Sequence, residues 1–332
     1  MSNRGRLAAA AHSSGLLRFH RLIGGPRLVV LNYHRIGNPM ECQFDRGVFS
    51  ASQDIFYRQC EAFVRWGYSI LSLEEILEAS DKNRRLSKNS LLLTFDDGYL
   101  DNYDLAFPIL KSLNLPAAFF LVPTFVGSNI VPWWDEIAYC VRNCELEMVR
   151  LSYPIPAIVR CQDREAAILA VLRLFKSPQN TDHEKFMCDL RKETGVVVPV
   201  QQRRFLSWVE AEQMQAAGMS IGSHTYTHRL LSQLSALDQE DEMLRSRAAI
   251  QAALGSGVRA LAYPVGARDS YTGETQRIAK EAGYDLAFSF HGGARKFHKG
   301  RRFEVPRMEA STDFRLLRFE MACLSQYGKL PY

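Results

Sequence analysis

The sequence predicts an α/β fold in which helices cover a parallel sheet. Short, continuous apolar segments alternate with longer segments of helical periodicity. Strands that are apolar on both faces are typical of parallel sheets buried between helices. Polar residues also follow directly after several apolar segments, namely His34, Asp96, Asp97, His224 and His291. In a β/α barrel the carboxyl ends of the strands meet on one rim, where catalytic groups gather.

The first half of the chain predicts three strands and two helices. LVVLNY (28–33), LLLTF (91–95) and AAFFLV (117–122, followed by Pro123) are apolar runs of strand length. A helix is expected over about 51–65, where apolar side chains recur at helical spacing, and another over about 100–113. Residues 133–205 are polar, helical in period and poor in strand signals, which predicts a helical insertion.

The second half continues the alternation. Strands are expected at 219–223, 261–263 and 285–290. A long amphipathic helix is expected over about 236–254, ending near Gly255, and a shorter one over 272–281.

Composition excludes several classes of protein. With 47% hydrophobic and 23% charged residues in a chain of 332, the sequence is that of a folded protein without a run long enough to cross a membrane. The net charge of +5 arises at the N-terminus: residues 1–27 hold five arginines and no acid, and the remainder has 36 basic and 36 acidic residues. This balance gives no case for nucleic-acid binding. The basic segment is expected to be frayed, with contact to an anionic membrane surface as the alternative.

The expected location is cytoplasmic, with membrane association left open. The apolar stretches near the N-terminus are interrupted by polar or basic residues, so a secretory leader is not expected. Seven cysteines form no C-x-x-C pair, which fits reduced thiols in a cytoplasmic protein.

Two motifs carry the chemistry. In TFDDG (94–98) Asp96 and Asp97 are adjacent, and adjacent residues of an extended chain point in opposite directions, so they must serve different partners. Asp-Gly is also a frequent turn dipeptide. In SHTYTH (223–228) His224 and His228 lie four residues apart, a spacing that suits a zinc-type ion, although alone it also fits ordinary surface histidines. One carboxylate and two imidazoles together make a set of three ligands with open positions for water and substrate.

In this order the two motifs resemble the polysaccharide deacetylase family (NodB homology domain, carbohydrate esterase family 4), and AYPVG (262–266) resembles the family's third motif. NYHRI (32–36), LSWVEAEQM (206–214) and VPRME (305–309) resemble the branch of poly-N-acetylglucosamine deacetylases. The resemblance covers about 28–310. It implies a distorted (β/α)7-type barrel with the helical insertion at 133–205, preceded by the basic, flexible segment 1–27 and followed by a C-terminal tail or helix at 311–332.

The resemblance also implies roles for individual residues. Asp97, His224 and His228 would bind a divalent metal, most often zinc in this family, and Asp96 would be the general base. His34 would be the general acid, with His291 as its rival.

The third motif would line the site and departs from the family pattern in one place. Pro264 and Val265 would lie at the site, with the Val265 N–H as a candidate oxyanion donor. The arginine that the family often has two residues before the proline is Ala262 here, and Arg307 is the candidate for the missing cation that orients Asp96.

Aromatic residues near the motifs are candidates for a sugar-binding cleft: Tyr99, Tyr263, Trp133 and Trp134. For the two tryptophans, packing of the insertion against the barrel is the alternative.

The expected function is a metal-dependent hydrolase that removes N-acetyl groups from an N-acetylated polysaccharide, oligosaccharide or glycolipid precursor, for example in exopolysaccharide biosynthesis. An O-acetyl esterase or small-amide hydrolase of the same fold and an inactive carbohydrate-binding module are the alternatives. The complete set of Asp96, Asp97, His224 and His228 argues against the inactive module. The sequence leaves the glycan, the native metal and the oligomeric state open.

Overall fold

The computed structural model describes residues 27–199, 204–296 and 302–330. Its centre is a mainly parallel sheet with the strand order β12-β1-β5-β6-β9-β10-β11-β13. The principal strands are β1 (Arg27–Tyr33), β5 (Ser90–Asp97), β6 (Ala118–Leu121), β9 (Ser220–Ser223), β10 (Ala260–Ala262) and β11 (Leu286–Ser289). The six strands expected from the sequence are all present. Shorter strands extend the edges: β4 (Ser69–Ile70) pairs with β5, and β12 (Arg295–Lys296) pairs with β1.

A short segment around residue 307 closes the sheet into a barrel. β13 (Val305–Pro306) pairs in parallel with β11, and β14 (Met308–Glu309) pairs in parallel with β1. Only Arg307 separates the two pairings, so one stretch of chain joins the last strand to the first. The six principal strands and this closing segment confirm the expected distorted (β/α)7-type barrel.

Alternation along the strands separates the barrel interior from its outer face. In β5, Leu92 packs with Phe120 and Phe288 inside the barrel. Leu91 and Leu93 belong to the cluster that lies under the outer helices. Both faces of the strand are therefore buried, which explains why β5 is apolar at nearly every position.

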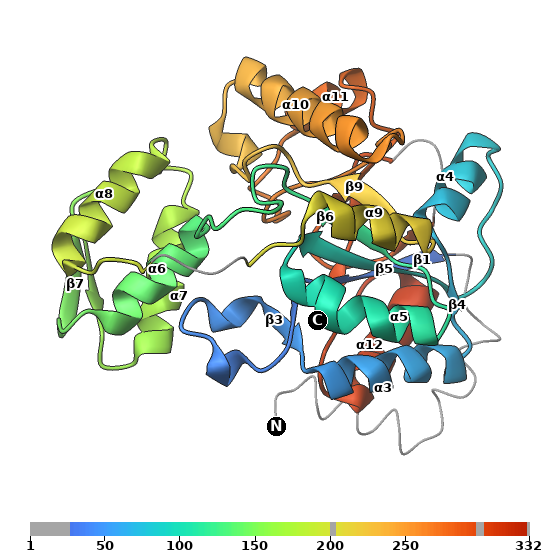
Figure 1. Ribbon diagram of the computed structural model, residues 1–332, viewed down its shortest axis with the longest axis horizontal. Helices are drawn as coiled ribbons and strands as arrows, with labels where there is room; N and C mark the ends of the chain where they lie inside the picture. Colours follow the sequence, from blue (N-terminus) through green and yellow to red (C-terminus); the bar gives the residue numbers. More distant parts are fainter. Residues whose placement is uncertain (1–26, 200–203, 297–301, 331–332) are drawn as a thin grey trace.

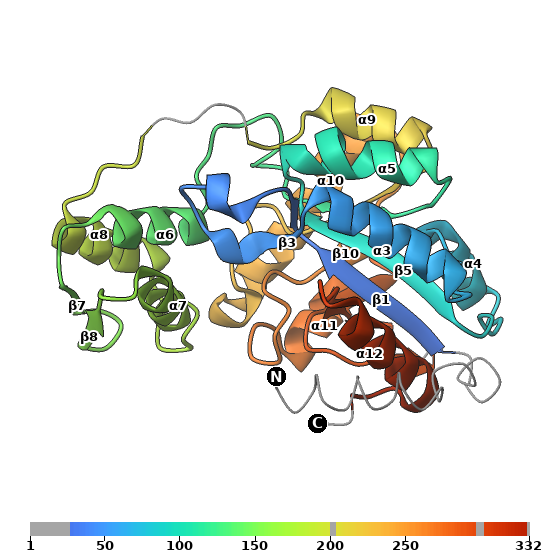
Figure 2. The same ribbon diagram turned by 90° about the horizontal axis from the view of Figure 1, so that it is seen from below.

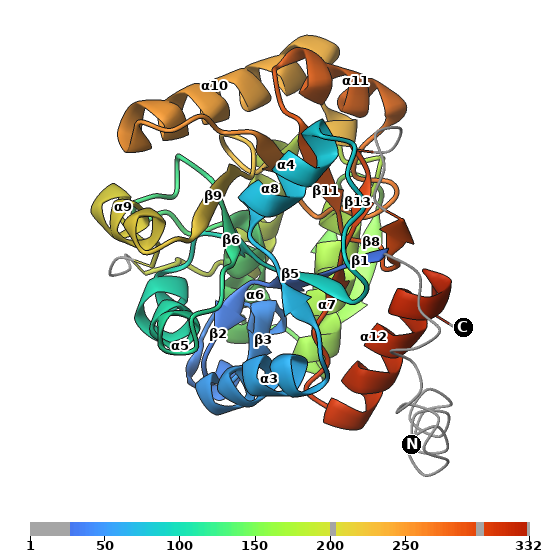
Figure 3. The same ribbon diagram turned by 90° about the vertical axis from the view of Figure 1, so that its right-hand side faces the viewer.

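Helices surround the strands, as Figure 3 shows. They are α3 (Gln53–Arg65), α4 (Leu73–Asp81), α5 (Phe107–Ser112), α9 (Trp208–Ala216), α10 (Ala236–Leu254), α11 (Gly273–Glu281) and α12 (Phe314–Tyr327). The helix expected over 100–113 is divided into a π-helical turn, Asn102–Ala106, and α5. The helices α4 and α9 were not predicted. The side chains of α4 belong to the cluster that fills the barrel interior, and in Figure 1 α4 lies at the end opposite the insertion.

The insertion forms a separate layer at the other end of the barrel (Figures 1 and 2). It contains α6 (Trp133–Asn143), α7 (Arg164–Phe175) and α8 (His183–Thr194) around a core of its own. The expectation of a purely helical insertion is wrong, because β7 (Met148–Leu151) and β8 (Ala157–Arg160) form an antiparallel hairpin. Each of these strands has four residues and buries only one face, so neither gives the continuous apolar signal of the barrel strands.

The predictions for the C-terminal end of the chain can be compared with the structure, but those for the N-terminal end cannot. Residues 1–26, and with them the predicted basic, flexible segment and its membrane contact, lie outside the described residues. The expected C-terminal helix is α12, which packs against β1. Within the described part of the chain, no helix is both long enough and apolar enough to span a bilayer.

Candidate active site

Asp96 lies at the carboxyl end of β5 and points into the barrel. It follows Leu92 by four residues, so strand alternation places both side chains on the interior face. The Arg307 guanidinium donates two hydrogen bonds to the carboxylate, each 2.7 Å long, and the Asn32 amide donates a third of 3.0 Å. The position of Arg307 between β13 and β14 is what directs its side chain to this point. Arg307 therefore lies where the sequence analysis placed the cation that orients Asp96.

The electrostatics of Asp96 favour the carboxylate. Burial alone would raise its pKa, but the charge of Arg307, and to a lesser degree that of His224, holds the pKa well below the ordinary range. Arg307 itself is 1% exposed and also donates to the Asn32 side-chain oxygen at 2.7 Å. Asp96 is thus an ionised, fixed acceptor.

Asp97, His224 and His228 converge beside Asp96. The Asp97 Oδ1 atom lies 3.3 Å from His228 Nε2 and 3.5 Å from His224 Nε2. The three ligand atoms all lie within 4.8 Å of one another, and all three residues are buried. His224 Nε2 is also 3.8 Å from the Asp96 carboxylate. The strand-end carboxylate and the two histidines, about 130 residues apart in sequence, are brought together as predicted.

Unusual backbone conformations direct these side chains. Among the described residues, seven that are not glycine have positive φ; three are asparagines, and the other four are Asp97 (72°), Thr225 (64°), His228 (59°) and Val265 (64°). All four lie in the three motifs. Such conformations are uncommon outside glycine and are retained where the surroundings impose them. Because the backbone turns at Asp97, the Asp97 side chain can approach His224, although the neighbouring Asp96 lies close to the same histidine. The two carboxylates still have different main partners, as expected: Arg307 for Asp96 and the two histidines for Asp97.

The unsatisfied atoms of this cluster fit a bound cation. The His224 Nδ1 atom is 2.8 Å from the Ala262 carbonyl oxygen, which can only accept, so the proton is on Nδ1 and the Nε2 lone pair faces Asp97. Burial lowers the pKa of His224 to about 4, which keeps the ring neutral. Asp97 Oδ1 is buried without a hydrogen-bond partner among the described residues. A lone pair and a carboxylate 3.5 Å apart repel each other unless a cation lies between them, so these residues fit a divalent metal.

Glu242 of α10 holds the histidine loop in place. Its buried carboxylate accepts hydrogen bonds from the Tyr226 N–H at 2.9 Å and the Thr227 N–H at 2.8 Å, and from the Thr227 hydroxyl. These groups lie between His224 and His228 in the sequence. The sequence analysis missed this function, because an acidic residue near the start of a helix has an adequate explanation in the helix dipole.

A cavity of about 250 Å³ lies over the cluster. Asp96, Asp97, His224 and His228 line it, as do the predicted residues His34, Val265, Trp133 and Trp134. The His34 backbone is fixed on both sides: its N–H donates to Ser50 Oγ at 2.9 Å and its carbonyl oxygen accepts from Asn102 at 2.7 Å. The Val265 N–H makes no hydrogen bond to any described residue.

Five predicted site residues do not line this cavity, and one of them is Arg307, which holds Asp96 from outside it. Tyr99 is fully buried and its hydroxyl accepts a hydrogen bond of 2.8 Å from the Trp134 indole N–H. Tyr263 stacks on Tyr271 in the core, and Pro264 is buried. These three residues are buried and absent from the cavity lining, and their contact with substrate stays a prediction. His291, the rival acid, lies 3.6 Å from Glu304 and outside the cavity.

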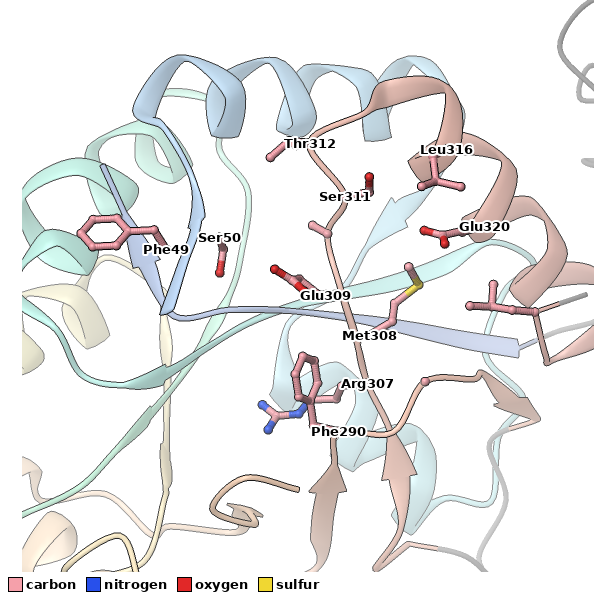
Figure 4. Close-up of a pocket in the computed structure, with 13 residues that line it drawn as sticks. Phe49, Ser50, Phe290, Arg307, Met308, Glu309, Ser311, Thr312, Leu316 and Glu320 are labelled. Carbon is pink, nitrogen blue, oxygen red and sulfur yellow. The ribbon is translucent and has the colours of Figure 1, made fainter. Parts of the chain in front are cut away.

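The structure adds residues that sequence motifs did not indicate. Phe290 lines the cavity beside His34, with the two rings 6.0 Å apart. A second cavity of about 540 Å³ also includes Phe290 and Arg307 in its wall. Figure 4 shows these two side chains together below Glu309 and Glu320. The Arg307 guanidinium is engaged with Asp96, but Asp96 and the residues of the candidate metal cluster do not line this second cavity.

The family model for polysaccharide deacetylases matches residues 83–287, well over half of the chain. The chain belongs to the polysaccharide deacetylase family. The deacetylase is 21% identical over 278 residues to the Bacillus subtilis protein YxkH, with 82% of this chain and 68% of YxkH covered. It is 29% identical over 110 residues to the poly-β-1,6-N-acetyl-D-glucosamine N-deacetylase of Staphylococcus epidermidis, which covers 30% of this chain and 38% of that protein.

Solved structures share the fold of the deacetylase. IcaB from Ammonifex degensii superposes with a TM-score of 0.58 at 22% identity, covering 91% of this chain and 98% of IcaB. The Streptococcus pyogenes deacetylase PplD, determined with acetate, gives a TM-score of 0.58 at 21% identity, covering 86% of this chain and 93% of PplD. At these identities the likeness supports the barrel fold.

Proposed function

We propose that this deacetylase is a metal-dependent N-deacetylase that hydrolyses the acetamide of an N-acetylated sugar. The proposal depends on one observation. Asp96, which Arg307 holds in its ionised form, lines the same cavity as Asp97, His224 and His228, whose unsatisfied atoms fit a bound cation. A bound divalent metal would polarise the acetamide carbonyl and lower the pKa of water.

The residues of the chain supply the proton transfers. Asp96 is held ionised and oriented by Arg307, so it accepts the proton of the attacking water. The free Val265 N–H is available to donate to the developing oxyanion. The His34 imidazole lies in the cavity wall and protonates the departing amine, which leaves as the amino sugar while acetate is released.

The choice of an acetamido sugar draws on the relatives. The matched Staphylococcus epidermidis protein is named as an N-deacetylase of poly-β-1,6-N-acetyl-D-glucosamine. The cavity also has tryptophan in its wall, and tryptophan side chains commonly pack against the apolar faces of sugar rings. N-acetylglucosamine residues are therefore the first substrates to test.

The decisive experiment measures acetate release from N-acetylglucosamine oligomers, acetylated xylan and small cyclic amides by the wild type and Asp96→Asn. We expect release from the amino sugars and a fall in kcat of roughly 10²-fold to 10⁴-fold in the variant, with zinc binding retained. Full activity of Asp96→Asn would refute the assignment of the base, and preference for acetylated xylan would point to an O-acetyl esterase.

Metal dependence is tested separately. Removal of metal with a chelator should abolish acetate release, and added zinc or cobalt should restore it. Unchanged turnover in protein shown to be metal-free by elemental analysis would contradict the proposal.

A further inference from the structure

One wall of the catalytic cavity, opposite the rim of the barrel, is formed by residues that do not belong to the barrel. The loop at 45–48 contributes Asp45 and Val48, and the insertion contributes Trp133, Leu172 and Lys176, among others. The loop is tied to the insertion, because the Asp45 N–H donates to the Asp135 carboxylate of α6 at 3.0 Å. The catalytic cluster is thus covered by residues that belong to none of the catalytic motifs.

Asp45 places a buried carboxylate in this wall. The residue is only 8% exposed. Its Oδ1 atom accepts a hydrogen bond of 2.8 Å from the Gly47 N–H, whereas its Oδ2 atom has no partner, and no cation of the described residues lies within ion-pair distance. The unpaired Oδ2 atom is not among the side-chain atoms that are closed to solvent, so water satisfies it until a ligand takes the place of that water. Since Asp45 lines the catalytic cavity, that oxygen is available to a substrate hydroxyl.

Lys176 adds a donor to the same wall, and Trp133 adds an aromatic ring. Lys176 follows α7 and makes no ion pair with a described residue; its ammonium lies 5.6 Å from the centre of the Trp133 ring. The Trp133 indole N–H is buried without a hydrogen-bond partner among the described residues. The ring is held by stacking on Phe175, with the ring centres 4.2 Å apart. The indole N–H is closed to solvent, so the wall offers one free acceptor, one free donor and an aromatic surface.

We propose that Asp45, Lys176 and Trp133 form a subsite for a single N-acetylated pyranose, so that the enzyme acts on one sugar at a chain end and not within a polymer. This inference rests on the proposed deacetylase function. Hydroxyl groups need both acceptors and donors, and the apolar face of a pyranose packs on an aromatic ring. The cavity of about 250 Å³ is smaller than the roughly 300–1,000 Å³ typical of sites for drug-sized ligands, a size that supports one sugar as its occupant.

The first test measures binding without turnover, by calorimetry on metal-free protein. We expect the affinities for the monomer, dimer and tetramer of N-acetylglucosamine to agree within about threefold, because a one-sugar pocket gains nothing from chain length. Affinity that rises steadily with length would overturn the pocket. If binding occurs as expected but the metal-loaded enzyme releases no acetate, the proposed function fails and the subsite stands. If the metal-loaded enzyme releases acetate but the metal-free protein binds no sugar, the subsite fails and the proposed function stands.

The second test uses Asp45→Asn and Lys176→Met. Asparagine caps helices as well as aspartate does, so the loop should be retained. Each variant should bind N-acetylglucosamine roughly 10-fold to 100-fold more weakly, the effect of losing a charged hydrogen bond, and should raise KM more than it lowers kcat, with zinc affinity unchanged.

Matched controls come from the same insertion. Asp163 caps α7 and Lys185 lies over the ring of Tyr153, and neither lines the cavity. Asp163→Asn and Lys185→Met should bind the sugar as the wild type does. Unchanged sugar affinity in both Asp45→Asn and Lys176→Met, or equal losses in the controls, would overturn the assignment.

The third test maps the position of the reaction. The tetramer of N-acetylglucosamine is treated with enzyme until one acetate per chain has been released, and the product is sequenced by mass spectrometry. We expect the free amine at a terminal residue. Amines at internal residues in comparable amounts would show that a polymer passes through the site and would refute the inference.

Discussion

Replacing Glu242 tests whether the histidine loop depends on a residue that touches neither substrate nor metal ligand. In Glu242→Gln the side chain keeps its length and one carbonyl oxygen, but an NH₂ group replaces the second acceptor. The amide oxygen can still accept from both backbone N–H groups, which share one oxygen of Glu242, and the NH₂ group can donate to the Thr227 hydroxyl, but the acceptor has lost its negative charge. The backbone N–H groups of the loop are then bound to a neutral acceptor, while Thr225 and His228 remain in a strained, positive-φ conformation.

The structure sets the size of the effect. A hydrogen bond to a charged group contributes about 1.5–3 kcal/mol, and each 1.4 kcal/mol is a factor of ten. A neutral hydrogen bond contributes about 0.5–1.5 kcal/mol, so replacing the charged acceptor of the two backbone N–H groups, with the effect felt at the two histidines, predicts zinc affinity weaker by roughly 10-fold to 100-fold. Partners of metal-ligating residues elsewhere have effects of about the same size.

Zinc affinity is measured by competition with a chromogenic chelator, alongside the thermal unfolding of the metal-free protein. Glu240→Gln is the matched control, because Glu240 is on the same helix and exposed. We expect the control to behave as the wild type. A folded Glu242→Gln protein whose zinc affinity is within twofold of the wild type would show that the loop holds its shape without Glu242, and the reasoning would be wrong.

Three further predictions concern stability, each measured by urea unfolding. Arg307→Met should cost about 3–5 kcal/mol, because it leaves the Asp96 carboxylate buried without its cation; a loss below 1 kcal/mol would contradict this account of the pair. Gly266→Ala should cost more than about 1 kcal/mol, since φ is +65° and the new Cβ would lie 2.6 Å from the Phe290 nitrogen; an equally stable variant would count against it. Trp134→Phe should cost about 1 kcal/mol through the lost indole hydrogen bond, and no change would mean that the bond contributes nothing net.

Local sequence signals predicted the parallel sheet and the polar residues at its strand ends, while the resemblance to the family supplied the barrel and the roles of the cluster. Strands such as β5 and β6 are buried on both faces, so they appear as continuous apolar runs that need no knowledge of their neighbours. The position of Asp97 and His224 directly after such runs then implies a common rim. The same reasoning could not separate rim residues from core residues. Tyr99 lies two residues beyond Asp97, but its ring is buried against Phe205, 5.0 Å away.

The cavity wall formed by the 45–48 loop and the insertion depends on tertiary packing that no local sequence pattern predicts. Asp45 and Lys176 are more than 100 residues apart in the sequence and belong to segments without a catalytic motif. They share a wall because the insertion docks on the loop through contacts such as the two hydrogen bonds of 2.7 Å from Arg142 to the backbone at residues 43 and 44. The sequence analysis described the insertion only as helical and left its function open.

Arg307 shows how the barrel and the catalytic base depend on each other. The chain pairs with β11 just before this residue and with β1 just after it. The same segment therefore closes the barrel and positions the guanidinium. The cation that holds Asp96 comes from the closing segment, while position 262 on β10 carries only a methyl group. An arginine at 262 would be anchored by a central strand; Arg307 is anchored by two pairings of two residues each. The orientation of Asp96 in this deacetylase therefore requires that the barrel be closed, and opening of the segment around Arg307 would remove the base and the barrel seam together.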